Sequence, residues 1–197
     1  MFDFWAHHSL IQGDYTLPQI KVEEELGHGN AHVYTATISN HQYALKQIEI
    51  KNDYEYQSFL QEISFMKDLS KNSQWFVQYH GYLLTMMQRN QFDQRKFAFI
   101  VMECAEENLE QFLMQHRDPR RRLTTPAMLR ITEQILTALT SLEEMHIAHC
   151  DIKPENILIM SSHKLTVKLC DVGSCKVVEK DNLGEATILG TVPFLAP

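Results

Sequence analysis

The residues best suited to chemistry gather in two short stretches of the second half of the chain. Residues 149–156 read His-Cys-Asp-Ile-Lys-Pro-Glu-Asn, and the sequence Leu-Cys-Asp-Val-Gly follows after a short apolar stretch. They supply a carboxylate at Asp151, an ammonium at Lys153, an amide at Asn156 and a second carboxylate at Asp171. Phosphoryl transfer needs such a set: an acceptor that orients the attacking hydroxyl, a cation that offsets developing charge, and two oxygen ligands for magnesium.

Weaker signals of the same chemistry lie in the first half. Gly27 and Gly29 stand between two strand-like stretches, where missing Cβ atoms let backbone N–H groups approach phosphate oxygens. An ordinary hairpin turn explains the same glycines. Lys46 lies in a strand-like stretch, and Glu62 follows on a helical face, so the pair can fix an ammonium near phosphate. A solvated surface pair is the alternative.

The hydrophobic pattern predicts the elements that position these residues. Apolar alternation with breaks at glycine and asparagine indicates strands, and apolar spacing of three and four indicates helices. In the first half we expect strands at 20–22, 32–38, 43–50, 76–84 and 97–103, a helix at 53–69, and an exposed polar loop at 88–96.

Beyond residue 105 the pattern becomes helical. A short helix is expected at 108–116 and a long one at about 126–145, with Thr125 as N-cap, Pro126 at the first position and Leu129 in the apolar stripe. The basic segment 117–122 between them is most simply a solvated loop, although it could dock an acidic peptide.

Composition narrows the class of protein. The chain has 197 residues, 44% of them hydrophobic and 22% charged, which suits a globular protein. A net charge of −7 argues against nucleic acid or an acidic membrane as the general partner. The four cysteines show no C-x-x-C spacing, and the first residues lack a basic, apolar leader, so we expect a protein of the cytoplasm or nucleus.

These motifs in this order resemble a eukaryotic protein kinase catalytic domain of the serine/threonine type. The resemblance runs from about Ile20 to the last residue, and the chain would then stop at the end of the activation segment. It rests on the glycine loop, Ala44-Leu45-Lys46, Glu62, the hinge Val101-Met102-Glu103, residues 151–156, residues 171–173, and Gly190-Thr191 to Ala196-Pro197.

The resemblance implies ATP and Mg²⁺ as cofactors and a protein with a Ser or Thr acceptor as substrate. Asp151 would act on the acceptor hydroxyl, Lys153 on the γ-phosphate, and Lys46, paired with Glu62, on the α- and β-phosphates. The implied metal ligands are Asn156 and Asp171. The implied nucleotide-binding residues are Leu26, Gly27, Gly29, Val33, Ala44, Lys46, Met102, Glu103, Ala105 and Asn156. His149 is interpreted as a packed structural histidine and not as a base.

Three positions depart from the family pattern. His32 stands where the third loop glycine is expected, Cys150 replaces the arginine before the catalytic aspartate, and Val172 replaces the phenylalanine of the magnesium motif. The irregular loop and Val172 motivate an alternative function, a pseudokinase that acts as a nucleotide-binding or scaffolding module. An active kinase is favoured because every residue named above as catalytic has its required chemical type.

The resemblance also predicts the fold and its division. We expect an α+β fold of two lobes, with a five-stranded antiparallel N-lobe that carries one main helix, and a mostly helical, partial C-lobe. The predicted domains are an N-terminal extension at 1–18, an N-lobe at 19–103 and a partial C-lobe at 104–197. No nucleic acid or membrane partner is expected, and the oligomeric state is left open.

Overall fold

A computed structural model describes residues 4–28, 31–90 and 92–178 of the chain. The chain divides into two compact units, the first made of residues 1–64 and 78–104 and the second of residues 65–77 and 105–197. Within the described ranges no helix is both long and apolar enough to cross a membrane.

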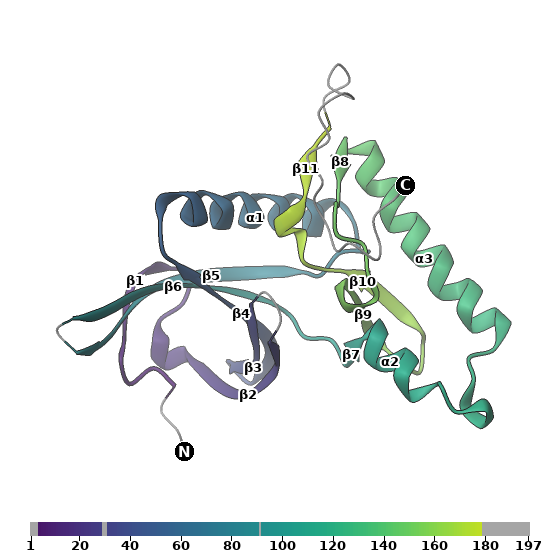
Figure 1. Cartoon of the computed structure of the whole chain (residues 1–197), viewed down its shortest axis with the longest axis horizontal. Coiled ribbons are helices and arrows are strands. Elements are labelled where there is room, and N and C mark those ends of the chain that lie inside the picture. The colour runs from purple at the N-terminus through teal and green to yellow at the C-terminus, as the bar shows by residue number, and fades with distance from the viewer. Residues whose placement is uncertain (1–3, 29–30, 91, 179–197) are drawn as a thin grey trace. The chain divides into compact units, whose positions relative to one another are not determined.

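The first unit is built on one antiparallel sheet (Figure 1). Its strands are β1 (His8–Gly13), β2 (Ile20–His28), β3 (His32–Ile38), β4 (His41–Ile50), β5 (Tyr79–Asn90) and β6 (Asp93–Glu103). The strand order is β1-β5-β6-β4-β3-β2. The sheet therefore has six strands, and the prediction of five is wrong. The additional strand β1 comes from the predicted N-terminal extension, and it pairs with β5 through backbone hydrogen bonds that its weak apolar pattern does not reveal.

The predicted loop at 88–96 is also wrong, because β5 and β6 extend through most of it. Gln88 pairs with Gln94 and Met87 with Arg95, so the two strands form a long hairpin beyond the core. There the exposed polar side chains interact with one another, as where Arg95 Nε lies 3.0 Å from Asp93 Oδ1. Backbone pairing therefore continues where the apolar alternation used to predict strands has ended.

One face of this sheet packs against helix α1 (Asp53–Asn72), which confirms the helix predicted at 53–69. Lys46, Ile100 and Tyr82 are cross-strand partners and so share this face. The buried ring of Phe59 on α1 lies 5.8 Å from the ring of Tyr82. Because Glu62 follows Phe59 by one helical turn, α1 brings its carboxylate to the face that carries Lys46.

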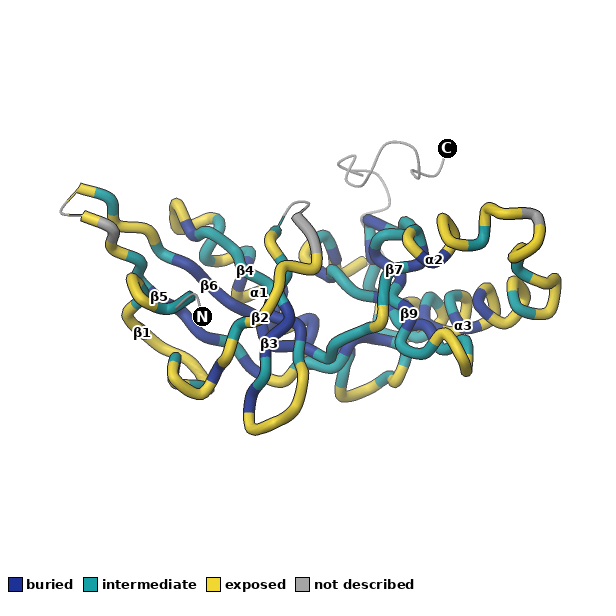
Figure 2. Tube along the Cα trace, turned by 90° about the horizontal axis from the view of Figure 1, so that it is seen from below, coloured by how far each residue is buried: buried dark blue, intermediate teal, exposed yellow. Residues whose placement is uncertain are grey.

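The opposite face is covered by the N-terminal segment. Phe99 and Val101 are fully buried on this face, and Figure 2 shows the buried middle of β6. The ring of Trp5 lies 5.0 Å from the ring of Phe99. The indole N–H of Trp5 donates to the carbonyl of Ile20 at 2.8 Å. Residues before position 20 are therefore part of the core of the first unit.

The second unit combines two helices with short strands (Figure 1). Its elements include β7 (Glu107–Asn108), α2 (Leu109–Gln115), α3 (Thr125–Glu144), β8 (Ile147–Ala148), β9 (Ile157–Ser161), β10 (Thr166–Leu169) and β11 (Lys176–Val177). The strands form two small sheets, β10-β9-β7 and β11-β8. Both predicted helices are confirmed.

Helix α3 packs against β10, and a buried glutamine joins the two. Gln134 donates to the carbonyl of Leu165 at 2.8 Å and accepts from the N–H of Val167 at 3.1 Å. Its amide thus binds backbone groups just before and within β10. A polar residue inside an apolar stripe thus fixes the hairpin of β9 and β10 to α3.

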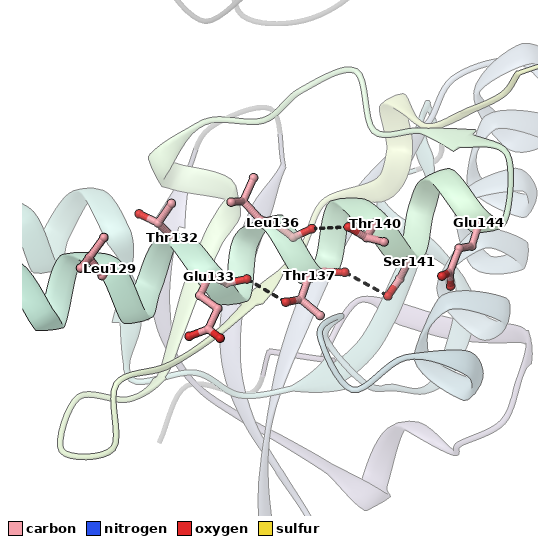
Figure 3. A pocket seen from close by; sticks show the side chains of 8 residues that line it. All are labelled: Leu129, Thr132, Glu133, Leu136, Thr137, Thr140, Ser141 and Glu144. Atoms are coloured by element: carbon pink, nitrogen blue, oxygen red, sulfur yellow. Dashed lines mark hydrogen bonds between the residues drawn. The ribbon is translucent and has the colours of Figure 1, made fainter.

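The other side of α3 faces outward, and Figure 3 shows its shallow depression. Leu129 is 64% exposed there, so its prediction as a core residue is wrong. The side chains of Thr137 and Thr140 donate to main-chain carbonyls four residues earlier, which satisfies their hydroxyl groups locally (Figure 3). The N-cap is Thr124 and not Thr125, because Thr124 Oγ1 accepts from the N–H of Ala127 at 3.4 Å.

Candidate active site

The segment that carries Asp151 is a loop held at both ends. It begins after β8, which pairs with β11, and ends in a 3₁₀ turn (Pro154–Asn156) that leads into β9. Cys150 has φ 64° and His146 has φ 55°, a backbone region that residues other than glycine seldom adopt. Such conformations cost free energy and are often found at functional sites.

The carboxylate of Asp151 is buried and oriented by two neighbours. Lys153 Nζ lies 2.8 Å from Asp151 Oδ2, and Asn156 Nδ2 donates to the same oxygen at 2.8 Å. Asn156 Nδ2 also donates to the main-chain carbonyl of Asp151 at 2.8 Å. Asp151 is 7% exposed and Asn156 6% exposed. The structure thus brings together three of the predicted site residues and holds Oδ2 of Asp151 between two donors.

A hairpin brings the second carboxylate to this loop. Strands β9 and β10 pair Ile157 with Leu169, so the residues that flank this pair are neighbours although they are far apart in sequence. The N–H of Cys170 donates to the carbonyl of Asn156 at 3.0 Å. Asp171 follows directly, with φ 56°, at the start of a 3₁₀ turn (Val172–Ser174). The hairpin therefore explains why residues 151 and 171 belong to one site.

His149 is a buried link within this site. It is 3% exposed, and its Nε2 lies at hydrogen-bond distance, 3.0 Å, from the carbonyl of Cys170. Burial lowers the pKa of the imidazole, although the Cys170 carbonyl and the charge of Asp171 act in the opposite direction. The packing and the hydrogen bond agree with its interpretation as a structural histidine.

Electrostatics keep Lys153 charged. Burial alone would lower the pKa of its ammonium. The hydrogen bond to Asp151 and the nearby carboxylates of Glu155 and Asp171 outweigh burial, and the pKa rises above its ordinary value. A lysine that stays protonated within this site is suited to attract the phosphate group of an anionic substrate.

The donor set suits magnesium. Asn156 uses its amide N–H groups on Asp151, so its carbonyl oxygen is the atom available to a cation, and Asp171 supplies a carboxylate. Within the described part of the chain, no group of three or more His, Cys, Asp or Glu could hold a metal ion. Magnesium commonly takes one or two protein oxygens and completes its shell with phosphate oxygens and water, so these two residues fit the ion.

In the first unit the predicted pair of Lys46 and Glu62 is present. Lys46 Nζ lies 2.6 Å from Glu62 Oε1, and their side chains are 13% and 8% exposed. The pair is therefore buried, and the alternative interpretation as a solvated surface pair is wrong. It joins strand β4 to helix α1, so the ammonium is held on one face of the sheet.

Strand register places three of the predicted nucleotide-binding residues, Val33, Ala44 and Met102, on the same face as Lys46. Val33 is the cross-strand partner of Lys46, and Ala44 is the partner of Met102. Partners share a face, and Ala44 is two residues from Lys46, so these side chains form one surface. Of the other predicted residues, Leu26 and Gly27 lie in β2, Glu103 ends β6, and Ala105 is the first residue of the longer segment of the second unit.

The structure describes the surroundings of the three positions that depart from the family pattern. Strands β2 and β3 remain paired up to His28 and His32, so the connection between them is short. The Cys150 thiol is oriented towards the carbonyl of Ala148 at 3.6 Å, and Val172 is buried, 4% exposed. Gly29 and the motif at residues 190–197 lie outside the described residues. Gln134, which links α3 to β10, is recognisable in the sequence only as an amide within an apolar stripe.

The comparisons with known proteins agree with this geometry. The protein kinase domain model matches residues 20–197, so the chain belongs to the protein kinase family. It is similar to the human serine/threonine-protein kinase D3, with 32% identity over 107 residues, which is 54% of this chain and 12% of that protein. It is also similar to the serine/threonine-protein kinase dkf-1 of Caenorhabditis elegans, with 37% identity over 102 residues, 50% of this chain and 14% of that protein. The aligned part is thus a small fraction of these relatives.

Proposed function

We propose that the chain carries the catalytic residues of an ATP-dependent protein serine/threonine kinase, which transfers the γ-phosphoryl group of ATP to a Ser or Thr hydroxyl of a protein. The observation that carries the proposal is the buried Asp151 carboxylate, with Lys153 and Asn156 each 2.8 Å from one of its oxygens. Membership of the protein kinase family and the serine/threonine kinases among its relatives support it.

Asp151 would orient the acceptor hydroxyl and accept its proton as the oxygen attacks phosphorus. The contacts to Lys153 and Asn156 keep the carboxylate in place, so little reorganisation is needed during reaction. Lys153 stays protonated at neutral pH, since its neighbours raise its pKa further above the ordinary value, and its charge would offset the negative charge that develops on the transferred group.

Asn156 and Asp171 would hold magnesium, which when bound with ATP neutralises phosphate charge. In the first unit, the ion pair with Glu62 would hold the Lys46 ammonium for contact with the α- and β-phosphates. Val33, Ala44 and Met102 on the same face of the sheet would pack against the nucleotide base.

Two matched substitutions separate these roles. Asp151→Asn should abolish phosphate transfer and leave ATP binding nearly unchanged, because Asp151 acts on the acceptor hydroxyl and not on the nucleotide. Asp171→Asn should instead weaken ATP binding in the presence of Mg²⁺. Glu133→Gln on the exposed side of α3 serves as the control, because it removes a carboxylate far in sequence from both motifs.

The measurements are calorimetric titration with ATP, with and without Mg²⁺, and transfer of labelled phosphate to peptides that differ only in a Ser, Thr or Tyr acceptor. Equal loss of ATP affinity in the two aspartate variants would contradict the assigned roles. Binding of ATP with no transfer by the unaltered protein would favour the nucleotide-binding module over the kinase.

A further inference from the structure

A basic turn between α2 and α3 is not used by the proposed chemistry. Arg117, Arg120, Arg121 and Arg122 fall within six consecutive residues, with Asp118 as the one acidic residue among them. All four arginine side chains are exposed. We refer to residues 117–122 as the arginine turn.

The arginine turn has a defined backbone. It contains a 3₁₀ turn (Pro119–Arg121) whose N-cap is Asp118. The carboxylate of Asp118 accepts from the N–H of Arg120 at 2.9 Å, and its main-chain carbonyl accepts from the N–H of Arg121 at 2.8 Å. The acidic residue of the turn is thus engaged in shaping the backbone and not in neutralising a guanidinium group.

The four guanidinium groups are available to a partner. None of them makes an ion pair with any residue that the structure describes, whereas Arg95 in the first unit pairs with Asp93. Guanidinium groups bind carboxylates in a bidentate geometry, and unpaired ones retain this capacity. The arginine turn is therefore an exposed surface that can bind carboxylates or phosphates.

Apolar side chains flank the arginine turn on both sides in sequence. Leu113 and Met114, in the last turn of α2, are 39% and 48% exposed. Met128 and Leu129, near the start of α3, are 47% and 64% exposed. Figure 1 shows the turn as the connection between these two helix ends. A partner that binds the arginines can therefore also bury apolar side chains.

We propose that the arginine turn and these flanking side chains bind a short acidic peptide segment of another protein, one that combines carboxylates with one or two apolar residues. The distribution of charge favours a short peptide over a long polyanion. The turn carries four positive charges and one negative charge, or +3, so the rest of the chain carries −10 to give the net charge of −7. A nucleic acid or acidic membrane would extend beyond the turn onto a chain whose other residues carry a net negative charge.

Screening confines the attraction to the turn. At physiological ionic strength charges interact over about 8 Å, roughly the reach of one side chain beyond the turn. A short acidic segment can lie within this distance of all four arginines. The proposal concerns binding and does not depend on phosphate transfer, so it can be tested without ATP.

The test uses a fluorescein-labelled peptide of alternating glutamates with two leucines, and its binding to the full chain is measured by fluorescence anisotropy. Replacement of the four arginines of the turn by glutamine should weaken binding by about tenfold, since each exposed charge pair contributes modestly. Arg95→Gln is the matched control and should leave binding unchanged. A variant with lysine at the same four positions retains charge, and should bind better than the glutamine variant.

Four results would overturn the proposal. They are no binding of the peptide to the unaltered chain, equal binding by the glutamine variant, equal binding of a lysine-rich peptide, and tighter binding to phosphatidylserine vesicles or duplex DNA than to the peptide. Circular dichroism of the glutamine variant shows whether it is folded. If the glutamine variant is not folded, the double variant Leu113→Ser with Met114→Ser is measured in its place. Unchanged peptide binding by this double variant would also refute the proposed surface.

Discussion

Removal of the Lys46 ammonium should destabilise the first unit much more than removal of an exposed lysine. Lys46 Nζ lies 2.6 Å from Glu62 Oε1, and the two side chains are 13% and 8% exposed. Lys46→Met retains most of the apolar stem and removes the charge. It leaves the carboxylate of Glu62 buried on the face of the sheet without its cation.

The magnitude follows from two opposing contributions. With an effective dielectric constant of about 20, charges 2.6 Å apart attract by about 6 kcal/mol. Transfer of the two charges from water offsets several kcal/mol of this, and loss of one partner from a buried pair costs about 3 kcal/mol. Lys51 is a matched control: its Nζ lies 3.6 Å from Glu49 Oε2, and it is 64% exposed. Lys51→Met should cost at most about 0.5 kcal/mol.

The assay is equilibrium unfolding in urea, with circular dichroism as the signal. It compares Lys46→Met, Lys51→Met and Glu62→Gln with the double variant that combines Lys46→Met and Glu62→Gln. The double variant should lose much less than the sum of its two single variants, because neither charge is left alone. Lys46→Met should also nearly abolish phosphate transfer. Strict additivity, or equal costs for Lys46→Met and Lys51→Met, would refute the argument for a buried, functional pair.

Three further outcomes are expected. Trp5→Ala should reduce the free energy of unfolding of the first unit by about 2 to 3 kcal/mol, since it removes a packed ring and a hydrogen bond, and an unchanged urea midpoint would contradict this. Gln134→Leu should cost about 2 kcal/mol by leaving the N–H of Val167 without its acceptor, so a neutral result would show that α3 does not need this link. Stability should fall as the pH drops below about 6.5, because burial lowers the pKa of His149 in the folded chain and the unfolded chain therefore binds the proton more readily. His149→Gln should flatten this part of the pH profile, and an unaltered profile would assign the pH dependence to other groups.

The sequence predicted the helices because each has a clear apolar period. It did not predict β1, whose residues are mostly exposed and whose pairing depends on a partner far along the chain. The extension of the hairpin of β5 and β6 was missed for a related reason. Backbone hydrogen bonds stabilise that pairing, and the polar side chains there give no apolar alternation from which a strand could be predicted.

For the candidate site, the sequence identified the residues but did not predict the distances between their side chains. The spacing of Asp151, Lys153 and Asn156 indicated a common loop, but the two contacts to one carboxylate oxygen depend on the backbone. The pair of Lys46 and Glu62 was ambiguous in sequence, because burial decides between a surface couple and a structural one. Burial arises from strands distant in sequence, and local pattern does not encode it.

Phosphate transfer in the presence and absence of the Asp151 carboxylate is the most direct test of the proposed function. The measurement is a single-turnover assay with labelled ATP, Mg²⁺ and a Ser or Thr peptide, for the unaltered protein and Asp151→Asn. We predict transfer by the unaltered protein and a loss of at least about a thousandfold in the variant, which still binds ATP. Equal rates in the two proteins, or ATP binding without any transfer by the unaltered protein, would contradict the assignment as a kinase.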